Sequence, residues 1–283
     1  MLGAIIGDIV GSIYEFDNIK TKDFKLFGPH ADNNPNYTMN GRDNSECFFT
    51  DDTVLTMAVA KWAMNDTSDL SDILSDFTFR YSNRGYGGMY MDWANTWDRQ
   101  PYNSFGNGSA MRVSSIPRLV PTYASMLDKA KQSAEVTHSH PEGIKGAQAT
   151  ALSIWLGIEG FETYEIREII SDFAGYDLSE SVDDIREWYY FNETCQKTVP
   201  QAIICALEAT SFEDAIRNAI SIGGDSDTVA AITGSIAEPI FGIPKNIANK
   251  AKSFLPIEFL KILHRVAIVA EYAQADVPAA YVS

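Results

Sequence analysis

The sequence contains few cysteines, and their spacing does not pair them. There are three, Cys47, Cys195 and Cys205, and no Cys-x-x-Cys pair occurs. An odd number without such a pair argues against a disulfide framework and against a zinc knuckle, and it suits a reducing compartment. We therefore expect a cytoplasmic protein.

Positive charge is also scarce. The chain has 22 lysines and arginines against 38 aspartates and glutamates, which gives a formal net charge of −16. An acidic surface repels phosphate backbones, so we expect no nucleic-acid binding through charge. Bound divalent cations would offset part of this negative charge.

No long uncharged apolar run is present. Residues 1–16 are mostly apolar, but Asp8 and Glu15 interrupt them and no basic residue precedes them. This pattern does not fit a secretory signal peptide, and the run is too short and too acidic to cross a membrane. We expect no membrane association. The 283 residues, 45% of them hydrophobic, suffice for one core, and we expect a monomer with a single domain over residues 1–283.

Alternating strand patterns are missing, whereas helical spacing is widespread. Apolar residues recur at intervals of three and four in many segments, and no Asn-Gly or Asp-Gly hairpin lies between alternating runs. The spacing predicts helices over 53–64, 125–138, 142–158, 194–209, 212–222, 226–241 and 257–273. We therefore predict an all-α fold, a single compact multi-helix domain.

Two long segments interrupt the helical pattern. Segment 17–46 is polar and contains Gly and Pro, and loops of such length are often lids or binding loops. Segment 80–109 mixes Gly with Tyr, Trp and Phe. This composition fits either an adaptable loop that offers stacking surfaces or a connector whose aromatic side chains fill the edge of the core.

Glycine recurs at every fourth position near the N-terminus, at Gly3, Gly7 and Gly11. On a helix these residues form a smooth stripe against which a second helix can pack closely. A dinucleotide-binding fingerprint would need Gly-x-Gly-x-x-Gly after a strand, which is absent. We therefore interpret the stripe as a packing surface. Asp8 and Glu15, seven positions apart, are expected to share one face of this helix.

Two short acidic motifs precede two of the predicted helices. The first acidic motif is Thr50, Asp51 and Asp52, and the second acidic motif is Asp225, Asp227 and Thr228. One carboxylate suffices to cap a helix N-terminus, but each motif carries two carboxylates and a hydroxyl. Neighbouring carboxylates repel each other unless a cation lies between them. Oxygen ligands without His or Cys favour Mg²⁺, Mn²⁺ or Ca²⁺ over zinc, so converging motifs would hold two divalent cations.

Two other known patterns were compared with the second acidic motif. Its letters DSDTV match the Asp-x-Asp pattern of haloacid-dehalogenase-type phosphatases, but that pattern follows a buried strand, and segment 212–222 is predicted to be a helix. A calcium-binding EF-hand loop requires a glycine and a closing glutamate at fixed positions, and both are missing.

Five motifs in order resemble the ADP-ribosylglycohydrolases, the family of dinitrogenase reductase-activating glycohydrolase. They are GAIIGDIVGSIYE (3–15), FTDDTVLTMAVA (49–60), FGNGSAMRVSSIPRL (105–119), THSHPEGIKGAQATALSIWL (137–156) and SIGGDSDTVAAITGSIAEPIFG (221–242). The resemblance covers nearly the whole chain. It implies an all-α domain with a cleft for two divalent cations, usually Mg²⁺ or Mn²⁺. It also implies hydrolysis of the bond that joins ADP-ribose to an acceptor, either a modified protein or another ADP-ribose conjugate.

The resemblance also implies roles for individual residues. The metal ligands would come from both acidic motifs and from the N-terminal glutamate: Thr50, Asp51, Asp52, Asp225, Asp227, Thr228 and Glu15. Asp51 or Asp52 would carry the proton in catalysis, with Glu15 as a second candidate. The substrate would be bound by Ser104, Phe105, Gly106, Asn107, Gly108 and His138, of which the small residues wrap the diphosphate and His138 contacts the distal ribose. Tyr86, Tyr90, Tyr102 or Phe105 would face the adenine.

The acceptor is left open between several classes. Modified arginine is the most common acceptor in this family, but the first motif has FTDDT where arginine-directed members commonly have SDDT. Serine-linked ADP-ribose and small conjugates such as O-acetyl-ADP-ribose are the alternatives. A non-catalytic binding or structural relative, such as the family's lens crystallin, would be expected to have a damaged acidic motif. Both motifs and Glu15 are intact, which favours an enzyme.

Overall fold

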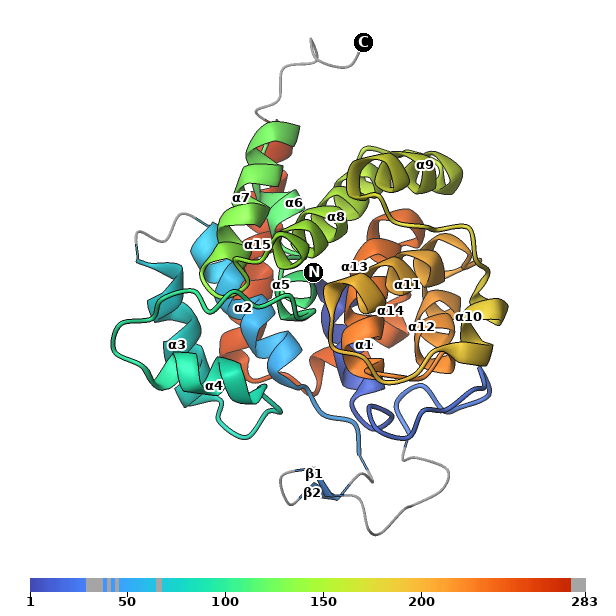
Figure 1. Cartoon of the computed structure of the whole chain (residues 1–283), viewed down its shortest axis with the longest axis horizontal. Coiled ribbons are helices and arrows are strands. Elements are labelled where there is room, and N and C mark those ends of the chain that lie inside the picture. The colour runs from blue at the N-terminus through green and yellow to red at the C-terminus, as the bar shows by residue number, and fades with distance from the viewer. Residues whose placement is uncertain (29–37, 40–41, 44–45, 65–67, 276–283) are drawn as a thin grey trace.

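The computed structural model in Figure 1 is built almost entirely from helices and describes residues 1–28, 38–39, 42–43, 46–64 and 68–275. The helices are α1 (Leu2–Gly11), α2 (Asp51–Ala63), α3 (Leu70–Arg80), α4 (Gly88–Asn95), α5 (Gly108–Met111), α6 (Ile116–Leu119), α7 (Tyr123–Glu135), α8 (Pro141–Ile158), α9 (Thr163–Ala174), α10 (Val182–Trp188), α11 (Cys195–Leu207), α12 (Phe212–Ser221), α13 (Ser226–Phe241), α14 (Lys245–Lys252) and α15 (Ile257–Ala275). Within these ranges the strands are the antiparallel pair β1 (Thr38–Met39) and β2 (Arg42–Asp43). The predicted all-α fold is confirmed.

The seven helices predicted from apolar spacing are all present, with ends that differ by no more than three residues. Helices α3, α6, α9, α10 and α14 were not predicted. Segment 80–109, predicted as a loop, contains α4 and the start of α5. Of segment 17–46, residues 29–37, 40–41 and 44–45 lie outside the described residues, so the predicted lid is not addressed there.

The glycine stripe of α1 packs directly against α13, as predicted. A Cβ atom at Gly7 would lie 1.9 Å from the carbonyl oxygen of Ala230, and one at Gly11 would lie 2.4 Å from Cα of Asp227. The order of these contacts shows that the two helices run antiparallel, and Figure 1 places them together near the centre of the molecule. The N-terminus of α13 therefore lies beside the C-terminal end of α1.

Helix α1 is shorter than the sequence suggested. It ends at Gly11, and Glu15 lies in the turns that follow, where Tyr14 N bonds to Gly11 O and Asp17 N bonds to Tyr14 O. The prediction that Asp8 and Glu15 share a helix face is therefore wrong. The Ser12 hydroxyl donates to Ile9 O and accepts a bond from Phe48 N, which joins this turn to the segment leading into α2.

A glycine pair shapes the turn before α13. Gly223 and Gly224 have φ angles of +74° and +79°, a region that residues with a Cβ atom rarely adopt. A Cβ atom at Gly223 would also lie 2.2 Å from Oδ1 of Asn18, which accepts a hydrogen bond from Gly224 N. This turn sets the position of Asp225 at the start of α13.

Within the described ranges, no helix combines the length and apolar character needed to cross a bilayer.

Candidate active site

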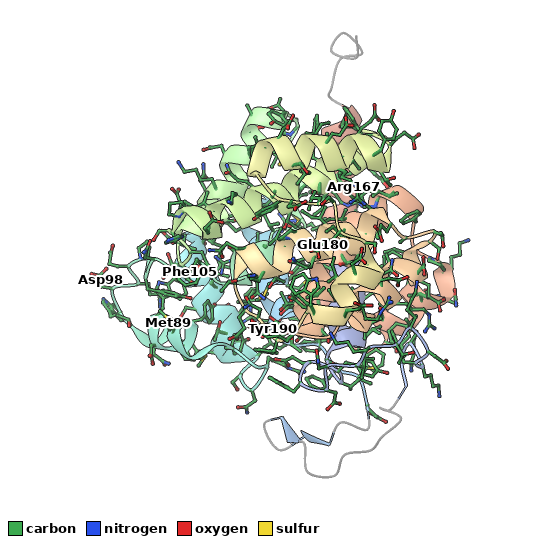
Figure 2. The ribbon with its side chains drawn as sticks, turned by 45° about the vertical axis from the view of Figure 1, so that its right-hand side comes forward. Met89, Asp98, Phe105, Arg167, Glu180 and Tyr190 are labelled. Atoms are coloured by element: carbon green, nitrogen blue, oxygen red, sulfur yellow. The ribbon has the colours of Figure 1, made fainter. Side chains whose placement is uncertain are left out.

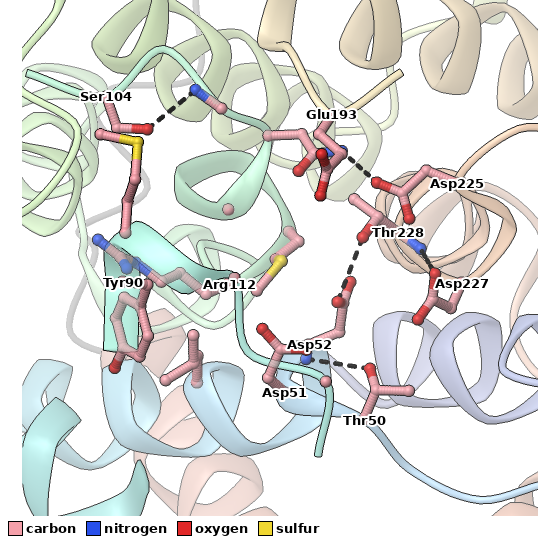
Figure 3. Close-up of a pocket in the computed structure, with 18 of the residues that line it drawn as sticks. Thr50, Asp51, Asp52, Tyr90, Ser104, Arg112, Glu193, Asp225, Asp227 and Thr228 are labelled. Atoms are coloured by element: carbon pink, nitrogen blue, oxygen red, sulfur yellow. Dashed lines mark hydrogen bonds between the residues drawn. The ribbon is translucent and has the colours of Figure 1, made fainter. Parts of the chain in front are cut away.

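The two acidic motifs meet in one cleft between the N-terminal ends of α2 and α13 (Figure 3). The hydroxyl of Thr228 donates to Oδ2 of Asp52 across the cleft, with 3.2 Å between the oxygens. Residues of both motifs line a cavity of about 270 Å³. The convergence that the metal hypothesis required is therefore present.

Helix capping does not account for these carboxylates. Thr50 caps α2, because its hydroxyl oxygen accepts a bond from Asp52 N at 3.2 Å. Asp225 occupies the N-cap position of α13, but its side chain makes no capping bond and instead accepts from Nδ2 of Asn107 at 2.6 Å. A hydroxyl does the capping at α2, so the carboxylates of Asp51 and Asp52 are available to a ligand.

Asp8 connects α1 to the first acidic motif. It is fully buried, and its carboxylate accepts bonds from the backbone N–H groups and the hydroxyls of both Thr50 and Thr53. Burial and then the charge of Asp227 raise the pKa of Asp8 to about 7. Asp8 was not among the residues predicted to form the site. The one feature of the sequence that pointed to a role for Asp8 is that it is a single charged residue in an otherwise apolar helix.

Three carboxylates form a candidate cation site. Glu15, Asp225 and Asp227 each offer an oxygen atom, and these atoms lie within 4.8 Å of one another. In the described part of the chain, Oε2 of Glu15 and Oδ1 of Asp52 are buried without a hydrogen-bond partner. Orphaned carboxylate oxygens in an all-oxygen cluster fit a hard divalent cation.

Burial and mutual repulsion raise the pKa of every carboxyl group in this cluster. The pKa of Glu15 is raised to about 11 by burial and then by the charge of Asp227, and that of Asp225 is raised to about 6 by burial. Burial and neighbouring carboxylates hold the pKa values of Asp51, Asp52 and Asp227 well above the usual range. The cleft therefore favours positive charge, whether it arrives as protons or as metal ions.

The residues predicted to bind substrate form a second part of the cavity wall, beside the acidic motifs. The cavity is lined by Ser104, Gly106, Asn107, Gly108 and His138. Cβ atoms at Gly106 and Gly108 would lie 3.5 and 3.2 Å from Nε2 of His138, so the absence of side chains leaves this nitrogen accessible. Phe105 differs from its neighbours, because it is 46% exposed and packs edge-on against His140 instead of lining the cavity.

A buried hydrogen-bond relay fixes the protonation state of His138. Nη2 of Arg112 donates to the hydroxyl oxygen of Thr137 at 2.8 Å, and that hydroxyl lies 2.7 Å from Nδ1 of His138. Because a guanidinium can only donate, we assign the hydroxyl proton to the bond with Nδ1. Burial and then the charge of Arg112 hold the pKa of His138 well below its usual value. His138 is therefore neutral and carries its proton on Nε2, toward the glycines.

The cavity also contains residues that sequence analysis did not assign. They are Leu55, Arg84, Gly85, Gly87, Gly88, Met89, Met111, Arg112 and Glu193. Of the aromatic candidates for the adenine, Tyr90 and Tyr102 line the cavity, whereas the Tyr86 hydroxyl donates to Tyr81 O. Glu193 and Arg84 gave no signal in the sequence, because each lies in an irregular segment and reaches the cavity only through tertiary contacts.

Comparisons with known proteins agree with this architecture. A family model for ADP-ribosylglycohydrolases matches residues 1–256. ADP-ribosylhydrolase ARH3 of Homo sapiens is 25% identical over 335 residues, covering 94% of this chain and 92% of the relative. ADP-ribosylarginine hydrolase Tri1 of Pseudomonas putida (strain GB-1) is 26% identical over 270 residues, covering 86% and 70%. A solved structure named ADP-ribosylglycohydrolase-related protein complex shares the fold, with a TM-score of 0.63, 22% identity and coverage of 96% and 94%.

Proposed function

Because the chain belongs to the ADP-ribosylglycohydrolase family, we propose that it releases ADP-ribose from modified arginine side chains and depends on two divalent cations. The family gives hydrolysis of ADP-ribosyl glycosidic bonds; the acceptor and the metals are the proposal. The observation that carries it is the convergence of Glu15, Asp225 and Asp227 with Asp51 and Asp52 in one cleft.

The cleft is suited to hold Mg²⁺ or Mn²⁺. The proposed ligands all offer oxygen atoms: Glu15, Thr50, Asp51, Asp52, Asp225, Asp227 and Thr228. Orphaned oxygens at Glu15 and Asp52 match such ions better than they match zinc, which prefers nitrogen and sulfur. When bound, divalent cations would polarise substrate oxygens and make a nearby water more acidic.

The part of the cavity wall formed by Ser104, Gly106, Gly108 and His138 would bind the nucleotide. Nε2–H of neutral His138 would donate a hydrogen bond to a substrate oxygen beside Gly106 and Gly108. These glycines leave space for a bulky group, and the adjacent Ser104 hydroxyl lies on the same wall. Tyr102, whose ring centroid lies 6.1 Å from that of His138, would offer an apolar surface to a sugar or base.

Asp51 and Asp52 are the proposed proton carriers. Their carboxylates lie in the same cavity as the other proposed cation ligands, so one of them would take a proton from the attacking water and pass it to the departing acceptor. Asp52 is tied to Thr228, whereas Asp51 is only half buried, which leaves Asp51 more accessible to substrate. General acid–base catalysis of this kind contributes roughly 10²–10⁴-fold to the rate. Glu15 is the second candidate.

Arginine is the acceptor that we favour. The relative from Pseudomonas putida is named for hydrolysis of ADP-ribosylarginine and aligns with 86% of this chain. The cleft is rich in carboxylates, which would attract a guanidinium. Serine-linked and small-molecule conjugates are the competing substrates, and the experiment is chosen to separate them.

The test is ADP-ribose release from two peptides, one modified on arginine and one on serine. Each is incubated with Mg²⁺ or Mn²⁺, with EDTA, and with the Asp227→Ala variant. Asp128→Ala is the matched control, because Asp128 lies outside the cavity on α7. We expect metal-dependent release from the arginine peptide that is lost only in Asp227→Ala. Release from the serine peptide alone, or release that survives EDTA, contradicts the proposal.

A further inference from the structure

Glu193 is an acidic residue of the cleft wall that has no role in the proposed reaction. It lines the cavity near Asp225, as Figure 3 shows, and its side chain is exposed. Across the residues that the structure describes, its carboxylate has no hydrogen-bond or ion-pair partner. It is also not one of the three carboxylates whose oxygens lie within 4.8 Å of one another. Glu193 is therefore an unpaired negative charge beside the candidate metal site.

The backbone around Glu193 is held firmly in place. Its carbonyl oxygen accepts a bond from Asn107 N at 2.7 Å. On either side, Oδ1 of Asn192 accepts from both N and Oγ1 of Thr194, and Cys195 N donates to Phe105 O at 2.9 Å. These bonds hold the backbone of Glu193 against the part of the cavity wall that carries Asn107.

The charge of Glu193 acts on the reaction centre. The pKa of Asp225 is raised most by burial and next by the charge of Glu193. The pKa of Asp51 is raised by burial, then by the charges of Asp227 and Asp8, and to a smaller extent by that of Glu193. Such an effect requires that the carboxylate lies near the two acidic motifs, and all of these residues line the same cavity. A cation bound at Glu193 would therefore lie in the cavity that holds both acidic motifs.

Two exposed aromatic rings, Phe191 and Phe16, stack on each other, and Phe191 lies two residues before Glu193 in the chain. Phe191 stacks on Phe16 with ring centroids 5.4 Å apart and an interplanar angle of 21°, although the two residues are 37% and 43% exposed. Phe16 directly follows Glu15 in the chain. Tyr190, which directly precedes Phe191 and is labelled in Figure 2, is 66% exposed. The stacked pair therefore joins the two chain segments that carry the cavity residues Glu15 and Glu193.

We propose that Glu193 and the Phe16–Phe191 pair form a guanidinium subsite that selects arginine as the acceptor. A guanidinium is planar, pairs with a carboxylate through two parallel hydrogen bonds and stacks on aromatic rings. A serine hydroxyl can use neither the charge nor the stacking surface. The inference rests on the proposed hydrolase function and specifies which residues recognise its substrate.

The kinetic test compares Glu193→Gln with wild type on the arginine-linked peptide. Loss of a charge-assisted contact should raise KM about tenfold, leave kcat within about twofold and leave the Kd of free ADP-ribose unchanged. Glu187→Gln removes the same charge from α10, outside the cavity, and should change none of these values. Phe191→Leu keeps apolar bulk but removes the ring, and should raise KM by a smaller factor. A KM within twofold of wild type in Glu193→Gln, or an equal loss of ADP-ribose affinity, overturns the subsite.

A binding experiment separates the subsite from the reaction. Agmatine, which carries a guanidinium, is titrated by NMR into protein saturated with Mg²⁺ and ADP-ribose, in wild type and in Glu193→Gln. We expect saturable binding that is lost in the variant. If neither peptide is cleaved but agmatine still binds through Glu193, the proposed reaction is wrong and the subsite stands. If wild type does not bind agmatine, the subsite is wrong, whichever peptide is cleaved.

Discussion

Removing divalent cations should make the stability of this protein depend strongly on pH. Asp8 and Asp225 have pKa values of about 7 and about 6 in the folded protein, against 3.8 for an ordinary aspartate. At pH values between 3.8 and these raised pKa values, the two groups bind more protons in the folded state than in the unfolded state. The free energy of unfolding therefore falls as the pH rises, and the fall continues up to the raised pKa values.

The size of the effect follows from these two pKa values. Between pH 5 and pH 7.5 the linkage relation gives a combined loss of about 4 kcal/mol for Asp8 and Asp225, with the larger share from Asp8. An unfolding entropy of about 2 cal/mol/K per residue gives roughly 0.6 kcal/mol/K for a chain of this length. The melting temperature should therefore fall by about 7 °C. Asp51, Asp52 and Asp227 act in the same direction, because their pKa values are also raised.

The assay is thermal unfolding from pH 5 to pH 7.5 in EDTA and in excess Mg²⁺. Bound Mg²⁺ replaces the protons, so in excess Mg²⁺ the melting temperature should vary less with pH than it does in EDTA. The rise in melting temperature that Mg²⁺ causes should therefore grow with pH. Measurements in 0.3 M NaCl screen the exposed charges but act much less on the buried cluster. Asp225→Asn should reduce the slope in EDTA by its own share. A melting temperature that stays flat in EDTA, or a Mg²⁺ effect that does not grow with pH, would refute the reasoning.

Two further substitutions test the packing and the histidine relay. Gly7→Ala places a Cβ atom against the carbonyl of Ala230 and should lower the free energy of unfolding by about 1–3 kcal/mol in thermal or urea melts. Gly88→Ala is its control and should be neutral or slightly stabilising, because Gly88 lies within α4 and nothing lies within 4 Å of the added atom; an equal loss in both variants would contradict the packing argument. Thr137→Val removes the hydroxyl that orients His138 and should weaken ADP-ribose binding about tenfold in calorimetry. Thr137→Ser keeps that hydroxyl, so affinity should return, and a loss in both variants would argue against the relay.

Among the helices that were not predicted, α9 and α14 have a narrow apolar face, whereas α3 has apolar residues at helical spacing and was overlooked. In α9 the buried residues are Ile166, Ile170 and Ala174, a single line of contacts in a segment that is otherwise exposed or half buried. In α14 they are Ile247 and Ala251 alone. One side of each helix packs on the core, and in α9 the side chain of Glu165 also caps the N-terminus by accepting a bond from Glu162 N. Apolar spacing within the segment carries little of that information.

The ligands of the candidate site could be predicted, but their arrangement could not. The two acidic motifs stood out because each combines carboxylates with a hydroxyl before a helix. Their convergence depends on the antiparallel contact of α1 with α13, to which the glycine stripe was the one clue. Asp8 and Glu193 were missed as site residues because tertiary contacts, to Thr50 and to Asn107, give them their positions. No local pattern in the sequence records those contacts.

The structure also separates what stabilises the fold from what the cleft requires. The contact between α1 and α13 brings Asp8, Asp225 and Asp227 together in a buried place, where their charges oppose one another. Folding alone would gain from neutral side chains at these positions, since buried like charges destabilise a protein unless a counter-charge is present. Close helix packing therefore works against the repulsion, and a bound cation would remove it. On this argument the acidic cluster is explained by the chemistry of the cleft, and the protein reaches its full stability only with that chemistry in place.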